Sequence, residues 1–223
     1  TLTFTNCTQS VIVKKAELSG SKSIYIPSNG ELSSPASNDY AFGTGDFTIE
    51  AWIRPAVNTT TQTLFDFRRL SATQGLRIIQ DAQAIKVYNG TTLMVSSGNV
   101  VTTTGQWMHI AAVRSSNITQ LYVNGAQLGG NYTDNNDYIY SGLYVGQDFN
   151  GATHWSGHMD NVVVKKGVAD YATGFTAPTQ IDYNNADIVF GLDGEAPFIL
   201  STEETYAQYS GQRSSSAGSR AID

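Results

Sequence analysis

Strict alternation of apolar and polar residues is the feature that most constrains how this chain can fold, and it is clearest in the run DFTIEAWIRP, Asp46 to Pro55. Its apolar side chains occupy the odd positions from Phe47 to Ile53. Successive side chains of a strand point to opposite faces, so these residues would share one face on a core. The other face carries Glu50 and Arg54 beside Trp52, which predicts that it is partly solvated or covered by a loop.

The same period-two pattern returns in short stretches that turn residues separate. QWMHIAAVR, Gln106 to Arg114, alternates again, and the pairs Asn89-Gly90 and Asn124-Gly125 are typical of tight hairpin turns. Further strands are expected at Ser23–Pro27, Gln62–Phe67, Leu76–Gln80, Ala84–Tyr88, Gln120–Val123, Leu143–Val145 and Met159–Val164. Charged residues make up only 14% of the chain, against roughly 25% in typical soluble domains, and Thr, Ser, Asn and Gly replace them. The sequence therefore predicts an all-β fold, a two-sheet antiparallel β-sandwich.

Charge and cysteine content exclude several classes of function. The formal net charge of −6 leaves no basic stripe for nucleic acid and disfavours an anionic membrane surface. No apolar run approaches the roughly 20 residues that a membrane-spanning helix needs, so membrane insertion is not expected. Cys7 is the single cysteine, so no disulfide can form within the chain, and it is expected to be a small core or strand residue.

Five runs of the chain together carry a family resemblance. They are, in chain order, GTGDFTIEAWIRP (Gly43 to Pro55), GQWMHIAAVR (Gly105 to Arg114), LYVNGAQLG (Leu121 to Gly129), LYVGQD (Leu143 to Asp148) and WSGHMDNVVVKKGVADYATGFTAPT (Trp155 to Thr179). In this order the runs resemble the laminin-G-like, concanavalin A-like lectin family, which implies a jelly-roll sandwich. The opening FGTGDFTIEAWI and the close ADYATGFTAPT are similar to repeats common in tail and fibre proteins of bacterial viruses.

Three regions are expected along the chain. Residues 1–179 would form the sandwich, and residues 180–200 a strand extension that packs on this chain's own sheet or on a neighbouring subunit. Within this extension, Ile188 to Leu192 would cap an otherwise exposed sheet edge. Residues 201–223 would be a polar tail or linker.

Hydrolysis is not expected. The family's glycan hydrolases carry acidic residues that alternate on one strand and so share a face. No predicted strand here offers such a set, and the adjacent pair Glu203-Glu204 would point to opposite faces. The chain is therefore predicted not to be an enzyme.

A small cluster of metal-binding residue types follows the second polar loop. His154, His158 and Asp160 have a spacing that would suit a helix face, but Trp155 to Gly157 between them favour a loop. We interpret the two histidines as loop or surface residues.

Two polar segments, Tyr132 to Asp137 and Gln147 to His158, are the expected ligand-binding rim. Their carboxylates and amides are the oxygen donors that calcium prefers, so calcium is the one candidate cofactor, at Asp134, Asp137 and Asp148. An aromatic plate among amides and carboxylates would also suit a sugar, although aromatic loop residues are commonly packing lids. The candidate ligand-binding residues are Tyr132, Asp134, Asn136, Asp137, Asp148, Asn150, His154 and Trp155.

The resemblance predicts a non-catalytic virion protein, located on the virion surface or tail, that attaches to host glycan or contacts other virion proteins. Its partners would be other virion proteins or further copies of itself, and cell-surface glycan. The alternatives are a secreted bacterial carbohydrate-binding or adhesion module, which would be extracellular, and a purely structural capsid or tail component.

Overall fold

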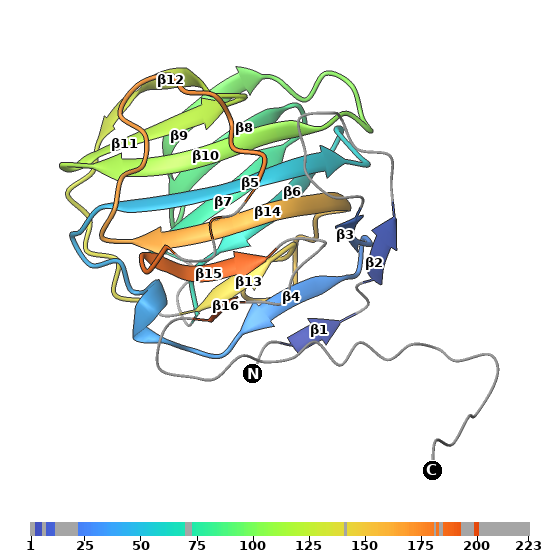
Figure 1. Ribbon diagram of the computed structural model, residues 1–223, viewed down its shortest axis with the longest axis horizontal. Helices are drawn as coiled ribbons and strands as arrows, with labels where there is room; N and C mark the ends of the chain where they lie inside the picture. The colour runs from blue at the N-terminus through green and yellow to red at the C-terminus, as the bar shows by residue number, and fades with distance from the viewer. Residues whose placement is uncertain are drawn as a thin grey trace, which may run out of the picture.

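Two β-sheets packed face to face make up the protein, and a computed structural model describes residues 3–5, 8–11, 22–69, 73–140, 142–180, 182, 185–192 and 199–200. The seven-stranded sheet lies behind the nine-stranded sheet in the view of Figure 1. Every paired strand is antiparallel to its neighbours, which confirms the predicted antiparallel sandwich. The one helical element described is a short 3-10 turn, η1, Asn38–Tyr40.

The seven-stranded sheet has the order β1-β4-β13-β6-β7-β8-β9. Its strands are β1 (Thr3–Thr5), β4 (Glu31–Ser34), β6 (Thr61–Asp66), β7 (Leu76–Asp81), β8 (Ala84–Asn89), β9 (Thr92–Asn99) and β13 (Leu143–Val145). Phe65, Ile78 and Val87 are register partners on β6, β7 and β8, and all three are buried between the sheets. This face of the sheet is therefore the core face.

The nine-stranded sheet has the order β12-β11-β10-β5-β14-β15-β16, and β3 and β2 extend it beyond β14. Its strands are β2 (Thr8–Val11), β3 (Lys22–Ile26), β5 (Phe47–Pro55), β10 (Met108–Ser115), β11 (Ile118–Val123), β12 (Ala126–Thr133), β14 (Gly157–Lys166), β15 (Ile188–Leu192) and β16 (Ile199–Leu200). Two strands pair with the same edge of β14: β3 pairs with its first residues and β15 with its last residues. The extension Ile188–Leu192 thus lies on this chain's own sheet.

The alternation in β5 has the predicted consequence. Phe47, Ile49, Ala51 and Ile53 are fully buried and belong to the core between the sheets. The other face of β5 is buried as well, by residues 168–179, which we call the strap. The strap runs across the outer face of the nine-stranded sheet and is drawn in orange in Figure 1.

Aromatic stacking and hydrogen bonds hold the strap on the sheet. The rings of Tyr171 and Phe175 are stacked 3.5 Å apart, and they pack against Tyr122. The hydroxyl of Tyr171 donates a 2.7 Å hydrogen bond to Glu50 Oε2, which also lies 3.1 Å from His109 Nε2. Burial, and then the negative charge of Glu50, raise the pKa of Tyr171, so this hydroxyl stays protonated and remains a donor.

The hairpin turn at Gly125 sits directly under the strap. Gly125 has a φ of +79°, and a Cβ at this position would lie 1.8 Å from the carbonyl oxygen of Phe175. We expect Gly125→Ala to lower the free energy of unfolding by about 1–3 kcal/mol, since it combines backbone strain with displacement of the strap. Chemical denaturation measures the change. Gly130→Ala is the matched control because nothing lies within 4 Å of the added Cβ; equal effects of the two variants would contradict this account.

Candidate functional site

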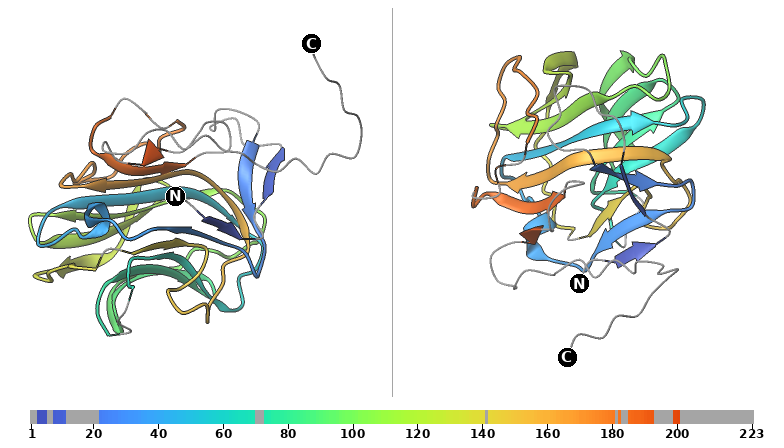
Figure 2. Two further views of the ribbon diagram at one scale, coloured as in Figure 1. Left: turned by 90° about the horizontal axis from the view of Figure 1, so that it is seen from below. Right: turned by 45° about the vertical axis from the view of Figure 1, so that its right-hand side comes forward.

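The outer face of the seven-stranded sheet carries a row of large side chains on neighbouring strands. Tyr144, Asp66, Arg77, Tyr88 and Leu93 are successive register partners on β13, β6, β7, β8 and β9. They alternate along each strand with the core residues, so they point away from the core. The strands of this sheet are curved, and the outer face of the sheet is its concave face in the left view of Figure 2.

Asp66, the second residue of this row, belongs to a buried ion pair. Arg68 binds Asp66 through two nitrogens, Nε at 2.9 Å from Oδ1 and Nη2 at 2.6 Å from Oδ2. The backbone amide of Phe149 donates a 3.1 Å hydrogen bond to the same carboxylate, and the Arg68 guanidinium lies 4.7 Å from the centroid of the Phe149 ring. Asp66 is therefore a fixed anchor that holds Arg68 and Phe149 at this face.

Arg77 is the second cation of the row. Its guanidinium lies 4.7 Å from the centroid of the Tyr88 ring. Burial, and then the charge of Arg68, lower the pKa of Arg77 from its ordinary value. The stacked pair of Arg77 and Tyr88 is thus a positively charged group on an aromatic surface, beside Leu93, whose side chain is 46% exposed.

Residues 147–154, in the segment between β13 and β14, lie against this face. Asp148 Oδ1 accepts hydrogen bonds from the backbone amides of Ala152 at 2.7 Å and Thr153 at 2.9 Å, which shapes the segment into a tight loop. The hydroxyl of Thr153 lies 2.6 Å from that of Thr63 on β6. His154 Nε2 lies 3.1 Å from the carbonyl oxygen of Gly151. The structure therefore brings three predicted ligand-binding residues together beside Phe149, namely Asp148, Asn150 and His154.

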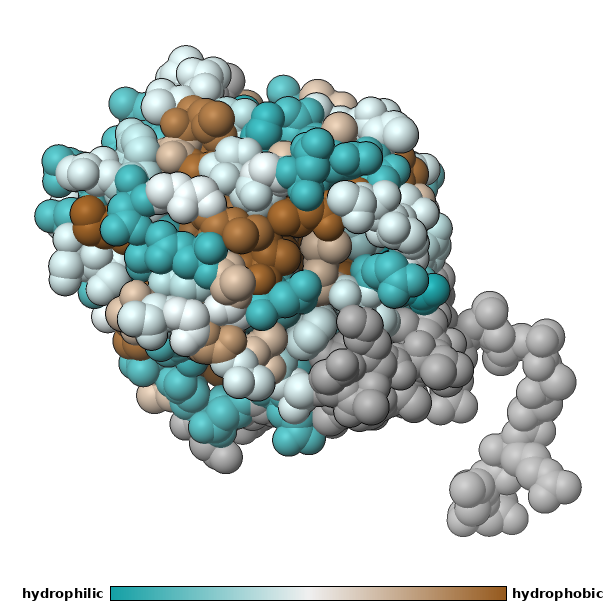
Figure 3. All heavy atoms as spheres, turned by 90° about the horizontal axis from the view of Figure 1, so that it is seen from above, coloured by the Kyte–Doolittle hydropathy of each residue, from teal (hydrophilic) through white to brown (hydrophobic). Residues whose placement is uncertain are grey.

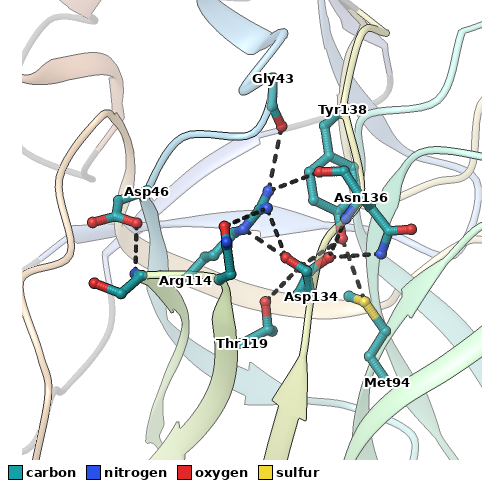
Figure 4. A network of polar contacts seen from close by, with 10 residues as sticks. Gly43, Asp46, Met94, Arg114, Thr119, Asp134, Asn136 and Tyr138 are labelled. Atoms are coloured by element: carbon teal, nitrogen blue, oxygen red, sulfur yellow. Dashed lines mark hydrogen bonds and ion pairs between the residues drawn. The ribbon is translucent and has the colours of Figure 1, made fainter.

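The predicted ligand Asp134 is instead the centre of a buried polar network, shown in Figure 4. It is fully buried. Its Oδ2 accepts hydrogen bonds from the hydroxyls of Thr119 at 2.6 Å and Tyr138 at 2.9 Å, and its Oδ1 accepts one from Asn136 Nδ2 at 2.6 Å. Arg114 Nε lies 3.9 Å from Oδ2. Both carboxylate oxygens are therefore occupied within the chain.

Arg114 explains why the network is buried. It is fully buried on the core-facing side of β10, near the end of the strand. Its Nη2 donates to the carbonyl oxygen of Asp134 at 2.7 Å. Its Nη1 donates to the carbonyl oxygens of Asn136 at 3.0 Å and Gly43 at 3.3 Å. Burial and the charge of Asp134 raise the pKa of Tyr138, which keeps its hydroxyl protonated as a donor. The role of this network is structural, because its hydrogen bonds satisfy the buried charge of Arg114.

The two predicted rim segments do not form one site. Tyr132 lies within β12, contrary to the loop that we expected, and packs against the core. Asn136 belongs to the Asp134 network and Asp137 is exposed. Within the described ranges, no hydrogen bond or ion pair joins these residues to the segment 147–156. Nor do three or more His, Cys, Asp or Glu side chains of that part of the chain meet in a group that could hold a metal ion. Calcium binding stays a prediction.

The structure contradicts the predicted role of Trp155 as a ligand-binding residue. It is fully buried in the core, and its indole nitrogen donates a 3.3 Å hydrogen bond to Gln80 Oε1. An aromatic plate for a sugar must be exposed, so Trp155 cannot be one. The half-buried rings at this face are those of Phe149, in the loop, and Tyr88, on β8, and Tyr88 was not among the predicted residues.

The predicted His154, His158 and Asp160 cluster is divided between two faces. His158, on β14, lies on the outer face of the nine-stranded sheet, 3.1 Å from the Ser23 hydroxyl and against the rings of Tyr25 and Trp107. Burial, and then the charge of Arg54, lower the pKa of His158. His154 lies in a loop against the other sheet, as interpreted, whereas His158 is half-buried within a strand and Asp160, on the same strand, is buried.

The described surface is mostly polar, and apolar side chains lie in small groups among polar ones in the view of Figure 3. Leu93 and Ile139 are the large apolar side chains that are strongly exposed in the part of the chain that the structure describes. No helix in this described part is long and apolar enough to cross a membrane. Cys7, the pair Glu203-Glu204 and the predicted tail 201–223 lie outside the described residues.

The sequence matches a laminin G family model, that of the concanavalin A-like lectin/glucanases superfamily, over residues 19–169. A search of curated proteins found no match.

Solved structures of similar fold come from proteins of different organisms. A protein from Bacteroides ovatus described as a candidate carbohydrate binding protein has a TM-score of 0.52 and 15% identity, over 85% of this chain and 50% of that one. Domain 4 of an extracellular GH43 arabinanase from Geobacillus stearothermophilus, in complex with arabinotriose, has a TM-score of 0.50 and 16% identity, over 73% and 83%. Domains LG4-5 of the mouse laminin alpha1 chain have a TM-score of 0.50 and 12% identity, over 71% and 47%. At these identities the likeness shows the fold.

Proposed function

The chain belongs to the concanavalin A-like lectin/glucanases superfamily, and we propose that it is a non-catalytic module that binds a glycan on the outer face of its seven-stranded sheet. The observation that carries the proposal is the row of register partners Asp66, Arg77 and Tyr88, with Phe149 beside it. Sugar recognition combines apolar ring surface with a few fixed polar groups. This face supplies both on a rigid sheet.

The state of the carboxylates favours binding over hydrolysis. A glycosidase needs two carboxyl groups on either side of the scissile bond, one as acid and the other as nucleophile or base. Both oxygens of Asp66 accept hydrogen bonds from Arg68, and Asp148 accepts from two backbone amides. Both carboxylates are therefore engaged as hydrogen-bond acceptors within the chain. This arrangement suits the positioning of Arg68 and of the loop, and not proton transfer or nucleophilic attack.

A role for the aromatic residues can be tested directly. We expect Tyr88→Ala and Phe149→Ala each to weaken glycan affinity by about tenfold, the loss of roughly 1.4 kcal/mol that an aromatic contact in a binding site commonly contributes. A glycan array identifies the ligand, and isothermal titration calorimetry measures the affinity. Tyr25→Ala, an aromatic truncation on the nine-stranded sheet, is the control. Unchanged affinity in the first two variants would contradict the proposed face, and a chelator arm tests calcium at Asp134, Asp137 and Asp148.

The biological setting is a narrower proposal that rests on the sequence resemblance. The runs FGTGDFTIEAWI and ADYATGFTAPT support a protein on the surface or tail of a bacterial virus, in contact with other virion proteins or further copies of itself. A secreted bacterial module and a purely structural virion component are the alternatives. Labelling of intact particles with an antibody against this chain tests the virion setting, and absence of label from particles would favour the secreted module.

A further inference from the structure

Arg77 is a cation that forms no ion pair with another residue in the part of the chain that the structure describes. The ion pairs of this part of the chain use other residues, and Asp66 is bound by Arg68. The Nε atom of Arg77 is buried and has no hydrogen-bond partner there, while the guanidinium rests on the Tyr88 ring. A buried donor without an acceptor is costly. Arg77 as a whole is only half-buried, so an acceptor on a ligand would meet its Nη nitrogens, while Nε stays covered by protein.

The carboxylates around Arg77 are held by other donors. Asp66 accepts from Arg68 and from the Phe149 amide, and Asp148 accepts from the amides of Ala152 and Thr153. The lowered pKa of Arg77 agrees with this geometry: burial and the charge of Arg68 outweigh the opposing effect of Asp66, Tyr88 and Asp148. An anion placed against Arg77 would therefore be stabilised by the guanidinium of Arg77, because Arg68 is already paired with Asp66.

We infer that the ligand of this face is an acidic glycan, and that Arg77 binds the carboxylate of a uronic acid unit. The inference rests on the proposed function and names its ligand class. A guanidinium presents its donors in a planar fork that matches a carboxylate. Tyr88 and Leu93 supply apolar surface beside it for the sugar ring. The chain's net charge of −6 repels polyanions in general, so such binding must come from a local site.

Paired polymers that share one backbone test the inference without altering the protein. The ligands are polygalacturonate and its fully methyl-esterified form, which differ only at the carboxyl group: it is a charged carboxylate in one and a neutral methyl ester in the other. Affinity electrophoresis and calorimetry on the full chain should show binding to the acid form that is at least about tenfold tighter and weakens with added salt. Dextran and dextran sulfate form a second pair, and a preference for dextran sulfate over polygalacturonate would overturn the carboxylate assignment.

Variants of Arg77 assign the contact. Arg77→Gln should lose about tenfold or more in affinity for polygalacturonate, and Arg77→Lys should fall between it and the wild type, because lysine keeps the charge but not the fork. Lys165→Gln removes the same charge on the nine-stranded sheet and should bind like the wild type. Thermal unfolding of each variant checks the fold, and the polymer pairs decide the matter if Arg77→Gln does not fold.

The outcomes separate this inference from the proposed function. Equal binding of the acid and esterified polymers, or binding of neutral glycans alone, would overturn the acidic ligand while the glycan-binding function stands. A folded Arg77→Gln variant with wild-type affinity for polygalacturonate would remove Arg77 from the contact. No binding of any glycan on the array would overturn the proposed function itself.

Discussion

Asp134→Ala is expected to lower the free energy of unfolding by about 3–5 kcal/mol, the usual result of removing one partner of a buried ion pair. Arg114 would stay buried beside an empty position, and the hydroxyls of Thr119 and Tyr138 would lose their acceptor. Urea denaturation followed by tryptophan fluorescence measures the change. The effect follows from the network in Figure 4, in which Thr119, Asn136 and Tyr138 donate hydrogen bonds to the carboxylate.

Asp137→Ala is the matched control for Asp134, because it removes an exposed carboxylate from the same segment. Its effect should stay within about 0.5 kcal/mol, as for most surface substitutions. The double variant Arg114→Met with Asp134→Leu should recover part of the loss, since it removes both buried charges together. Two equally mild single variants would show that Asp134 is not a structural anchor. A stability loss on adding a chelator to the wild type would favour calcium at this position.

The second large effect is expected from Trp155→Ala, which should cost about 3–5 kcal/mol of stability, as truncation of a core Trp usually does. Trp155 is fully buried, and its ring lies so close to Gly157 that a Cβ there would be 2.7 Å from it. Removing the indole would therefore leave a cavity and take away the donor that binds Gln80 Oε1. The midpoint and slope of the denaturation curve report the loss.

Phe149→Ala, on the same segment, is the control that distinguishes packing from ligand contact. Phe149 is only half-buried, so its truncation should cost about 1 kcal/mol or less of stability, while it weakens glycan binding. Trp155→Phe should retain binding and lose less stability than Trp155→Ala. If Trp155→Ala weakened binding without loss of stability, the ring would have to act as a sugar plate, and its assignment to the core would be wrong.

Much of the fold could be predicted because β-structure leaves a local pattern. Alternation in Asp46 to Pro55 placed the core-facing residues correctly, and the pair Asn124-Gly125 marked a real hairpin turn. Strands β9 and β12 were not predicted as strands, since Thr92–Asn99 and Ala126–Thr133 lack regular alternation. Their extended form comes from pairing with their neighbours.

The candidate site was harder to predict because it depends on register between strands. Arg77 and Tyr88 become neighbours only when β7 pairs with β8, and Phe149 joins them from a loop far along the chain. One missed feature could have been predicted from the sequence. The alternation of Gln106 to Arg114 puts Arg114 on the core-facing side of its strand, where a buried arginine needs a carboxylate partner. A buried Asp close to Arg114 was therefore to be expected.

The sequence by itself determined the class of fold, the hairpin turns, the family and the core face of β5, because each depends on residues close together in the chain. Only the tertiary structure decided that Asp134 and Trp155 are buried and that Arg77 and Tyr88 lie together on an exposed face. Whether a polar or aromatic side chain contacts solvent or protein depends on which distant strands and loops cover it, and that information is absent from local spacing.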